Sequence, residues 1–152
     1  MPIGLKGNAD GSGAIQVGST DAISISADLS VTFAGAISTT GAIGYATGAG
    51  GVVTQLTSKA TTVVLDKLTG QITLNNAALA AATIVSFTLT NSNIAATDVL
   101  ILNHLSGGTV GAYTLNAQAA AGSATINVRN ATAGSLSEAI VISYAVIKGV
   151  IA

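Results

Sequence analysis

The residues that could carry out chemistry in this chain of 152 residues are few and scattered. His104 is the single histidine, and Ser106 lies close behind it. A Ser-His-Asp arrangement needs only one histidine, but the sequence around Ser106 does not resemble the elbow that presents a catalytic serine. We therefore interpret His104 as a residue beside a turn or in an interface, and we assign no catalytic residue.

The acidic and glycine-rich segments give no clear site either. Glycoside hydrolysis needs two carboxylates about 5–10 Å apart, whereas the acids here are spread along the chain and mostly adjoin turns. They are Asp10, Asp21, Asp28, Asp66, Asp98 and Glu138. Asn8–Gly13 has the start of a calcium loop without its bidentate glutamate, and Thr47–Gly51 lacks the Lys-Ser/Thr of a phosphate loop. We expect no metal site, no cofactor and no enzymatic activity.

Surface binding has one candidate site. Tyr45, Lys59, Tyr113 and Tyr144 could form a shallow sugar-binding patch. Tyrosine rings in all-β proteins also fill cores and interfaces with the hydroxyl at the edge, and this second interpretation is favoured. Asn130–Thr132 matches a glycosylation sequon, a three-residue pattern that matters only in a secreted eukaryotic protein.

The composition excludes two classes of partner. Charged residues make up 7% of the chain, against about 25% in an ordinary soluble domain. The five Lys and Arg residues form no basic block, so we expect no nucleic-acid binding. The mean hydropathy is +0.67, but Thr, Ser, Asn and Gln interrupt the long uncharged stretches, so we expect no membrane span.

The dominant hydrophobic period is two, which predicts strands. The branched residues Val, Ile and Thr are frequent in these segments and suit a pleated sheet. Strands are expected at Ala22–Ser26, Leu29–Phe33, Thr61–Leu65, Gln71–Leu74, Thr83–Thr90, Val99–Asn103, Ala112–Leu115, Ala124–Val128 and Ala139–Ile147. Turn residues separate them at intervals typical of a sandwich or barrel. The sequence therefore predicts an all-β protein.

A change in composition near residue 45 divides the chain. Residues 45–152 have the size and strand number of an antiparallel β-sandwich, and we expect one of jelly-roll type. Residues 1–44 are too few and too apolar to bury a core of their own. The sequence predicts that they form an extended N-terminal β arm used for assembly.

The scarcity of charge indicates self-association. A monomer protects its strand edges and its solubility with charged residues and proline, and this chain has few of either. We expect a homo-oligomer, with three-fold association preferred because three arms together can bury a stripe that one cannot. The predicted interface is the apolar stripe of the arm, made of Ile23, Ile25, Leu29, Val31 and Phe33.

Three segments resemble sequences that recur in small proteins of tailed bacteriophages and prophages. The first is the block from Gly44 to Leu79. The second is the ending from Ser135–Ala139 through Ala145–Lys148. The third, Asp21–Ile25 through Val31–Phe33, resembles the lead-in that precedes such domains in fibre-like chains.

This resemblance implies a structural protein of the virion. The preferred role is a capsid decoration or cement protein, with the major capsid protein or other virion proteins as partners. The alternative is a tail-fibre or tip component that binds a host surface glycan or receptor. The resemblance brings no catalytic residues with it.

Overall fold

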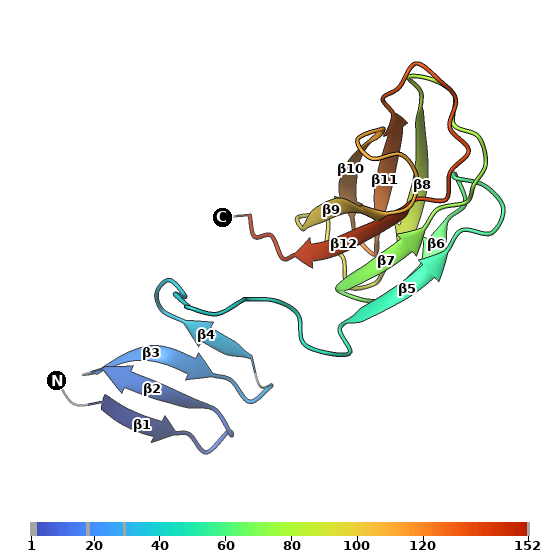
Figure 1. Ribbon diagram of the computed structural model, residues 1–152. Coiled ribbons are helices and arrows are strands. Elements are labelled where there is room, and N and C mark those ends of the chain that lie inside the picture. The colour runs from blue at the N-terminus through green and yellow to red at the C-terminus, as the bar shows by residue number, and fades with distance from the viewer. Residues whose placement is uncertain (1–2, 18, 29, 152) are drawn as a thin grey trace. The chain divides into compact units, whose positions relative to one another are not determined.

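The computed structural model describes residues 3–17, 19–28 and 30–151, and within them the chain is all-β, as the sequence predicts (Figure 1). Twelve strands form three four-stranded sheets, and no helix occurs among these residues. The chain divides into two compact units, Met1–Gly44 and Tyr45–Ala152. The first unit holds one sheet and the second holds two.

The first unit is a four-stranded antiparallel meander, where the sequence predicts an extended arm. Its strands follow the order β1-β2-β3-β4. They are β1 (Ile3–Gly7), β2 (Gly13–Val17), β3 (Thr20–Ile25) and β4 (Val31–Phe33). The two strands expected from the sequence overlap β3 and β4, whereas β1 and β2 have no counterpart in that prediction.

Two aspartates close turns that fold this segment back on itself. Asp10 Oδ1 accepts hydrogen bonds from the Ser12 hydroxyl at 2.7 Å and from the Ser12 backbone N–H at 3.0 Å. Asp28 Oδ1 accepts from the Ser26 hydroxyl at 2.6 Å and from the Ser30 N–H at 3.1 Å. The hydroxyls, followed by the N–H groups, lower the pKa of both carboxyls, that of Asp28 to about 2. Both turns share the pattern Ala-Asp-x-Ser, so each aspartate bonds its own turn, as Asx turns do.

The second unit consists of two four-stranded sheets. One has the order β10-β11-β8-β6 and the other the order β5-β7-β12-β9. The strands are β5 (Gly50–Thr54), β6 (Val63–Val64), β7 (Thr69–Thr73), β8 (Ile84–Thr90), β9 (Val99–Ser106), β10 (Tyr113–Ala120), β11 (Ser123–Asn130) and β12 (Val141–Ile147). Each of the seven strands expected in this unit overlaps one of them, and β5 is the strand that the sequence analysis missed.

Two strand pairs in the second unit are parallel, so it is not the wholly antiparallel jelly roll that the sequence predicts. Strand β5 runs parallel to β7, and β6 runs parallel to β8. The cause is the path of the chain. Because β6 lies in the opposite sheet from β5 and β7, the chain crosses between the sheets twice and returns to the first sheet in the same direction. A jelly roll is antiparallel throughout, and hydrophobic pattern alone does not encode strand order.

Strand β5 begins at Gly50, within the glycine-rich segment Thr47–Gly51. The absence of side chains has a packing function here. A Cβ atom at Gly51 would lie 2.8 Å from Leu65 Cδ1, and one at Gly70 would lie 2.6 Å from Leu65 Cδ2 and 3.0 Å from Tyr144 Cε1. The two glycines pair across β5 and β7, so Leu65 packs directly against their backbone.

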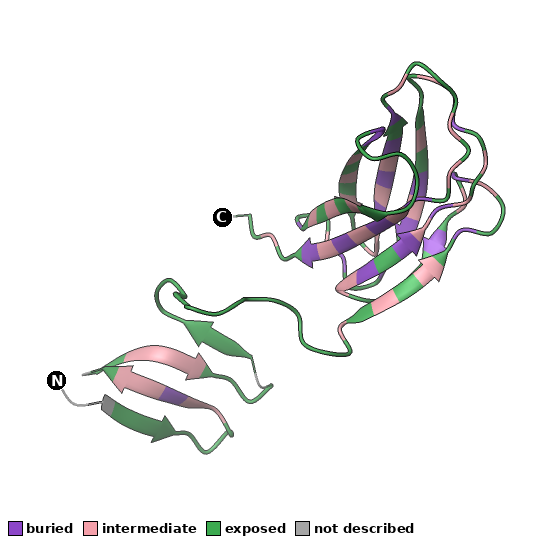
Figure 2. Ribbon diagram, viewed as in Figure 1, coloured by how far each residue is buried: buried purple, intermediate pink, exposed green. Residues whose placement is uncertain are grey.

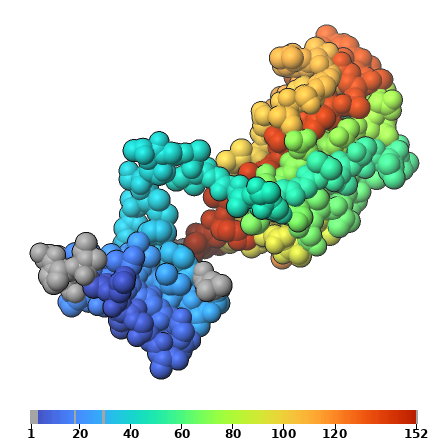
Figure 3. Space-filling model, turned by 60° about the horizontal axis from the view of Figure 1, so that its bottom comes forward, coloured from blue at the N-terminus to red at the C-terminus, as the bar shows by residue number. Residues whose placement is uncertain are grey.

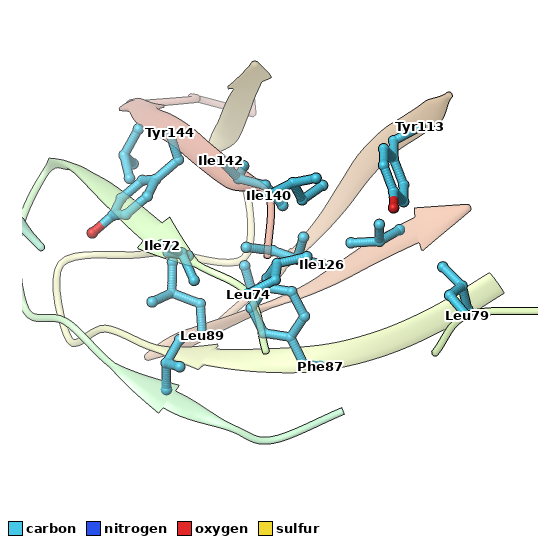
Figure 4. Close-up of a cluster of buried hydrophobic side chains, with 14 of the residues drawn as sticks. Ile72, Leu74, Leu79, Phe87, Leu89, Tyr113, Ile126, Ile140, Ile142 and Tyr144 are labelled. Atoms are coloured by element: carbon cyan, nitrogen blue, oxygen red, sulfur yellow. The ribbon is translucent and has the colours of Figure 1, made fainter. Parts of the chain in front are cut away.

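One hydrophobic core lies between the two sheets of the second unit (Figure 4). Side chains alternate between the core and the outside along each strand, which gives the alternating bands of buried and exposed residues in Figure 2. The largest fully buried apolar residues are Tyr144, Ile72, Leu74, Leu89, Ile126, Ile140, Ile142, Val128 and Val146. Two sheets that share one core in this way have a β-sandwich-like arrangement, and we call this unit the sandwich.

We expect Gly70→Ala to destabilise the sandwich by about 1–3 kcal/mol, because the added methyl group overpacks the contact with Leu65 and Tyr144. Urea unfolding followed by near-ultraviolet circular dichroism reports on this unit, since Tyr45, Tyr113 and Tyr144 all lie in it. The matched control is Gly50→Ala, whose Cβ would make only an ordinary contact of 3.5 Å with Thr69. Equal stability of the two variants would contradict this packing.

Candidate functional site

The most distinctive surface of the first unit is one apolar face of its sheet. The cross-strand register aligns Leu5, Ile15, Ile23 and Phe33 in one row. Ile25 and Val31 are partners in the next row. Cross-strand partners project from the same side of a sheet, so these residues lie together. We call the set the N-terminal apolar face: Leu5, Ile15, Val17, Ile23, Ile25, Val31 and Phe33.

No second layer covers this face within the described residues of the first unit. Ala14 is the one buried residue among them, and it lies in the neighbouring row of the opposite face, between Lys6 and Ser24. Val31 is 51% exposed and Phe33 is 44% exposed. An isolated sheet must pack its apolar side against another layer to be stable. The face is therefore the strongest candidate for an interaction surface.

Four of the five residues predicted for the assembly interface belong to this face. They are Ile23, Ile25, Val31 and Phe33, on β3 and β4. Leu29 lies outside the described residues. Leu5, Ile15 and Val17 were missed because β1 and β2 are short and rich in glycine. The alternation Ile3-Gly4-Leu5 and Ala14–Val17 is the signal that could have revealed them.

A long exposed segment follows the N-terminal sheet. Residues 34–48 are all exposed and contain no strand, and β5 begins at Gly50. Figure 3 shows much of this segment as a single thread of atoms.

The proposed sugar-binding residues do not form one exposed patch. Tyr144 is 2% exposed and Tyr113 is 9% exposed, whereas Tyr45 is 43% exposed. The Tyr144 hydroxyl donates to the backbone carbonyls of Leu65 and Lys67, at 3.2 and 3.0 Å. Burial raises the pKa of Tyr144 to about 12. Two of the three tyrosines are thus core residues with a bonded hydroxyl.

Lys59, the cationic member of that set, is 3% exposed and holds two loops together. Its Nζ donates to the backbone carbonyls of Asn75 and Glu138. Gln55 completes the network by donating to the carbonyl of Lys59 at 3.0 Å and accepting from the N–H of Asn75 at 3.2 Å. Burial lowers the pKa of Lys59. This ammonium group is committed to the loops and is not available on the surface.

A second polar cluster surrounds Glu138. Its carboxylate accepts from the Thr109 hydroxyl at 2.7 Å, the Thr109 N–H at 2.9 Å and the Tyr113 hydroxyl at 2.8 Å. These bonds lower the pKa of Glu138, and the bond from the Thr109 hydroxyl has the largest effect. Burial raises the pKa of Tyr113. The His104 ring packs edge-on against Tyr113, and its Nε2 lies 2.7 Å from the Gly107 carbonyl. The cluster ties the β9–β10 loop to the segment before β12.

Asp98 fixes the end of β12. Its carboxylate accepts from the N–H of Ala95 at 2.8 Å, from Lys148 Nζ at 2.6 Å and from the N–H of Gly149 at 3.1 Å. The pKa of Asp98 is lowered, chiefly by the bond from Ala95. A Cβ atom at Gly149 would lie 1.9 Å from the carbonyl oxygen of Thr97, so only glycine fits.

The remaining sequence motifs have structural roles. Asn130 of the sequon is fully buried, and its amide donates to the carbonyls of Leu79, Ala80 and Gly134.

Among the described residues, no group of three or more His, Cys, Asp or Glu side chains could hold a metal ion. The same part of the chain contains no helix long and apolar enough to cross a membrane.

Comparison of the chain with protein-family models, with curated proteins and with solved structures finds no match.

Lys59→Met should destabilise the second unit by about 1–3 kcal/mol, because the carbonyls of Asn75 and Glu138 lose their donor in a buried setting. Urea unfolding measures the change. Lys67→Met is the control, since Lys67 Nζ donates to the Gly48 carbonyl on the exposed surface, and its effect should stay within about 0.5 kcal/mol. A similar loss in both variants would show that Lys59 does not hold the loops.

Acid should destabilise the second unit because the pKa values of Glu138 and Asp98 are lower in the folded chain. Above the ordinary carboxyl pKa of about 4, both groups are ionised in both states and their contribution is complete. As the pH falls from about 4 through the folded-state values, the unfolded chain takes up protons first, and that contribution is lost.

The check is the melting temperature, measured by near-ultraviolet circular dichroism as the pH is lowered from neutral. Glu138→Gln should weaken the dependence below about pH 4, because one of the carboxyls with a lowered pKa no longer titrates. An unchanged pH profile in this variant would contradict the assignment.

Proposed function

We propose that the chain is a non-enzymatic structural protein of a bacteriophage virion, and that its role is that of a capsid decoration or cement protein. The observation that carries the proposal is the uncovered N-terminal apolar face. The resemblance of Gly44–Leu79 and of the C-terminal segment to phage proteins supports the assignment to a virion. The N-terminal sheet is the assembly element, and the sandwich is the part that projects from the particle.

Burial of the N-terminal apolar face supplies the driving force for assembly. From the exposed fractions of its side chains, the face presents roughly 500 Å² of apolar surface, as large as the largest patch on a typical monomer. Burying it contributes about 12 kcal/mol per copy before the cost of association is subtracted. A homotrimer satisfies this requirement, because three such faces converge on one axis and leave none in water.

A decoration protein also benefits from weak contacts repeated by symmetry. Each trimer would bind the major capsid protein, or another virion protein, at several equivalent points. The strength of attachment then comes from the number of contacts rather than from one strong site. This mechanism fits a chain in which 7% of residues are charged, since it needs no cluster of ion pairs.

The alternative is a tail-fibre or tip component that binds a host surface glycan. A row of neutral polar groups on the outer face of sheet β10-β11-β8-β6 favours it. Asn127 donates to Asn116 Oδ1 at 2.6 Å and accepts from the Ser86 hydroxyl at 2.6 Å. Aligned amides and hydroxyls match the hydrogen-bonding groups of a sugar. Glycan-array binding that Asn127→Ala abolishes would favour this function over decoration.

Val31→Asp should give a folded chain that no longer trimerises through the N-terminal apolar face, because the substitution buries an unpaired charge in the interface at a cost of several kcal/mol. Light scattering on the size-exclusion peak measures the number of copies. Thr32→Asp is the matched control, since Thr32 is the next residue of β4 and pairs with Ser24 on the opposite face. Normal assembly of Val31→Asp, or equal loss in both variants, would contradict the proposed interface.

A further inference from the structure

The two outer faces of the sandwich differ in the charge that they carry. The outer face of sheet β5-β7-β12-β9 exposes the large apolar residues Val52, Val99, Ile101 and Ile147, and Leu105 is exposed further along β9. The register places Ile101 beside Ala145, and Val99 beside Ile147. Neutral polar residues fill the rest of the surface, with Gln71 beside Ser143 and Val52. We call this surface the sandwich apolar face.

The opposite sheet of the same sandwich serves as an internal comparison. Its outer face carries the bonded amides and hydroxyls of Asn116, Asn127 and Ser86. It also carries Arg129, which pairs with Ile84 across the strands. That face therefore carries a charge and bonded polar groups, beside the exposed apolar residues Val64 and Ile84. The sandwich apolar face, in contrast, has no charged residue at the described outward positions of its four strands. The difference points to a covered surface.

We infer that the sandwich apolar face is a contact surface for a second copy of the same chain. A two-fold contact places the same patch on both sides, and residues near the axis meet their own copies. A face that pairs with itself is therefore favoured when it carries no like charges, as is the case here. A charged partner would find nothing here to attract it. The inference rests on the proposed assembly function and adds a second contact to it.

The size of the face fits a stable contact between two copies. Its exposed apolar and neutral polar side chains present roughly 700 Å² per copy, so a pair would bury about 1,400 Å², within the range of specific interfaces. A shallow depression of about 460 Å³ lies on this sheet, lined by Gly50, Gly51, Val52, Thr69, Gly70, Gln71 and Ser143. The depression gives room for an apolar side chain of the partner, and the pair of sheets would pack as in other sheet-on-sheet contacts.

Two contact surfaces of different symmetry make the assembly larger than either alone. Trimers formed through the N-terminal apolar face would pair through the sandwich apolar face. The closed product is a pair of trimers with six copies.

The test measures the molar mass of full-length variants by light scattering on the size-exclusion peak. Ile101→Lys places a charge on the sandwich apolar face, and Ile84→Lys is its matched control on the other outer face. Ile101 is 53% exposed and Ile84 is 60% exposed, so both substitutions should be tolerated by the fold. Circular dichroism verifies folding, and Val99→Lys replaces Ile101→Lys if that variant unfolds.

The inference expects Ile101→Lys to halve the molar mass of the wild-type assembly and Ile84→Lys to leave it unchanged. Val31→Asp should leave a dimer, and Val31→Asp combined with Ile101→Lys should be monomeric. An unchanged mass for folded Ile101→Lys, or a wild-type chain that is monomeric at high micromolar concentration, would overturn the inference.

The same variants separate this inference from the proposed function. If Ile101→Lys lowers the mass but Val31→Asp does not, the sandwich contact stands and the N-terminal interface fails. If Val31→Asp lowers the mass but Ile101→Lys does not, the proposed function stands and the second contact is wrong. Equal losses for Ile101→Lys and Ile84→Lys would also overturn the inference, because the effect would not be specific to one face.

Discussion

A β-sheet has two faces, and a stable protein must cover the one that is apolar. The second unit meets this requirement internally, because its two sheets pack their inner faces on the common core around Ile72, Ile126 and Ile142. The first unit has a single sheet, and its described residues provide no second layer for the face that carries Ile23 and Phe33. The proposed assembly follows from this difference between the units.

The low charge content is compatible with a well-ordered fold because polar side chains bond to the backbone instead. Asp10 and Asp28 close the turns of the first unit. In the second unit, Asn130 bonds loop carbonyls, and Lys59 joins two segments through their carbonyls. None of the described buried side-chain polar atoms lacks a hydrogen-bond partner. Burying polar groups in this way avoids the penalty of leaving them unsatisfied, and their hydrogen bonds stabilise the fold.

The period-two pattern predicted the all-β class and the strands with clear alternation, such as β8 and β11. It failed at β5, because Gly50 and Gly51 carry no side chains to form a pattern, and their role depends on Leu65. It could not give the parallel pairs, since these depend on how the chain crosses between sheets. The pattern also could not predict the contacts of Glu138, because Thr109 and Tyr113 lie 29 and 25 residues away along the chain. The apolar stripe of β3 and β4 was visible because it is local.

The most direct test of the account is the number of copies in the full chain compared with residues 45–152 alone, measured by light scattering on the size-exclusion peak. The central claim is that the N-terminal sheet is the assembly element. The account predicts a full chain whose number of copies is a multiple of three, and a truncated chain that is at most a dimer. A full chain that is monomeric, or a number of copies that does not change when residues 1–44 are removed, would contradict it.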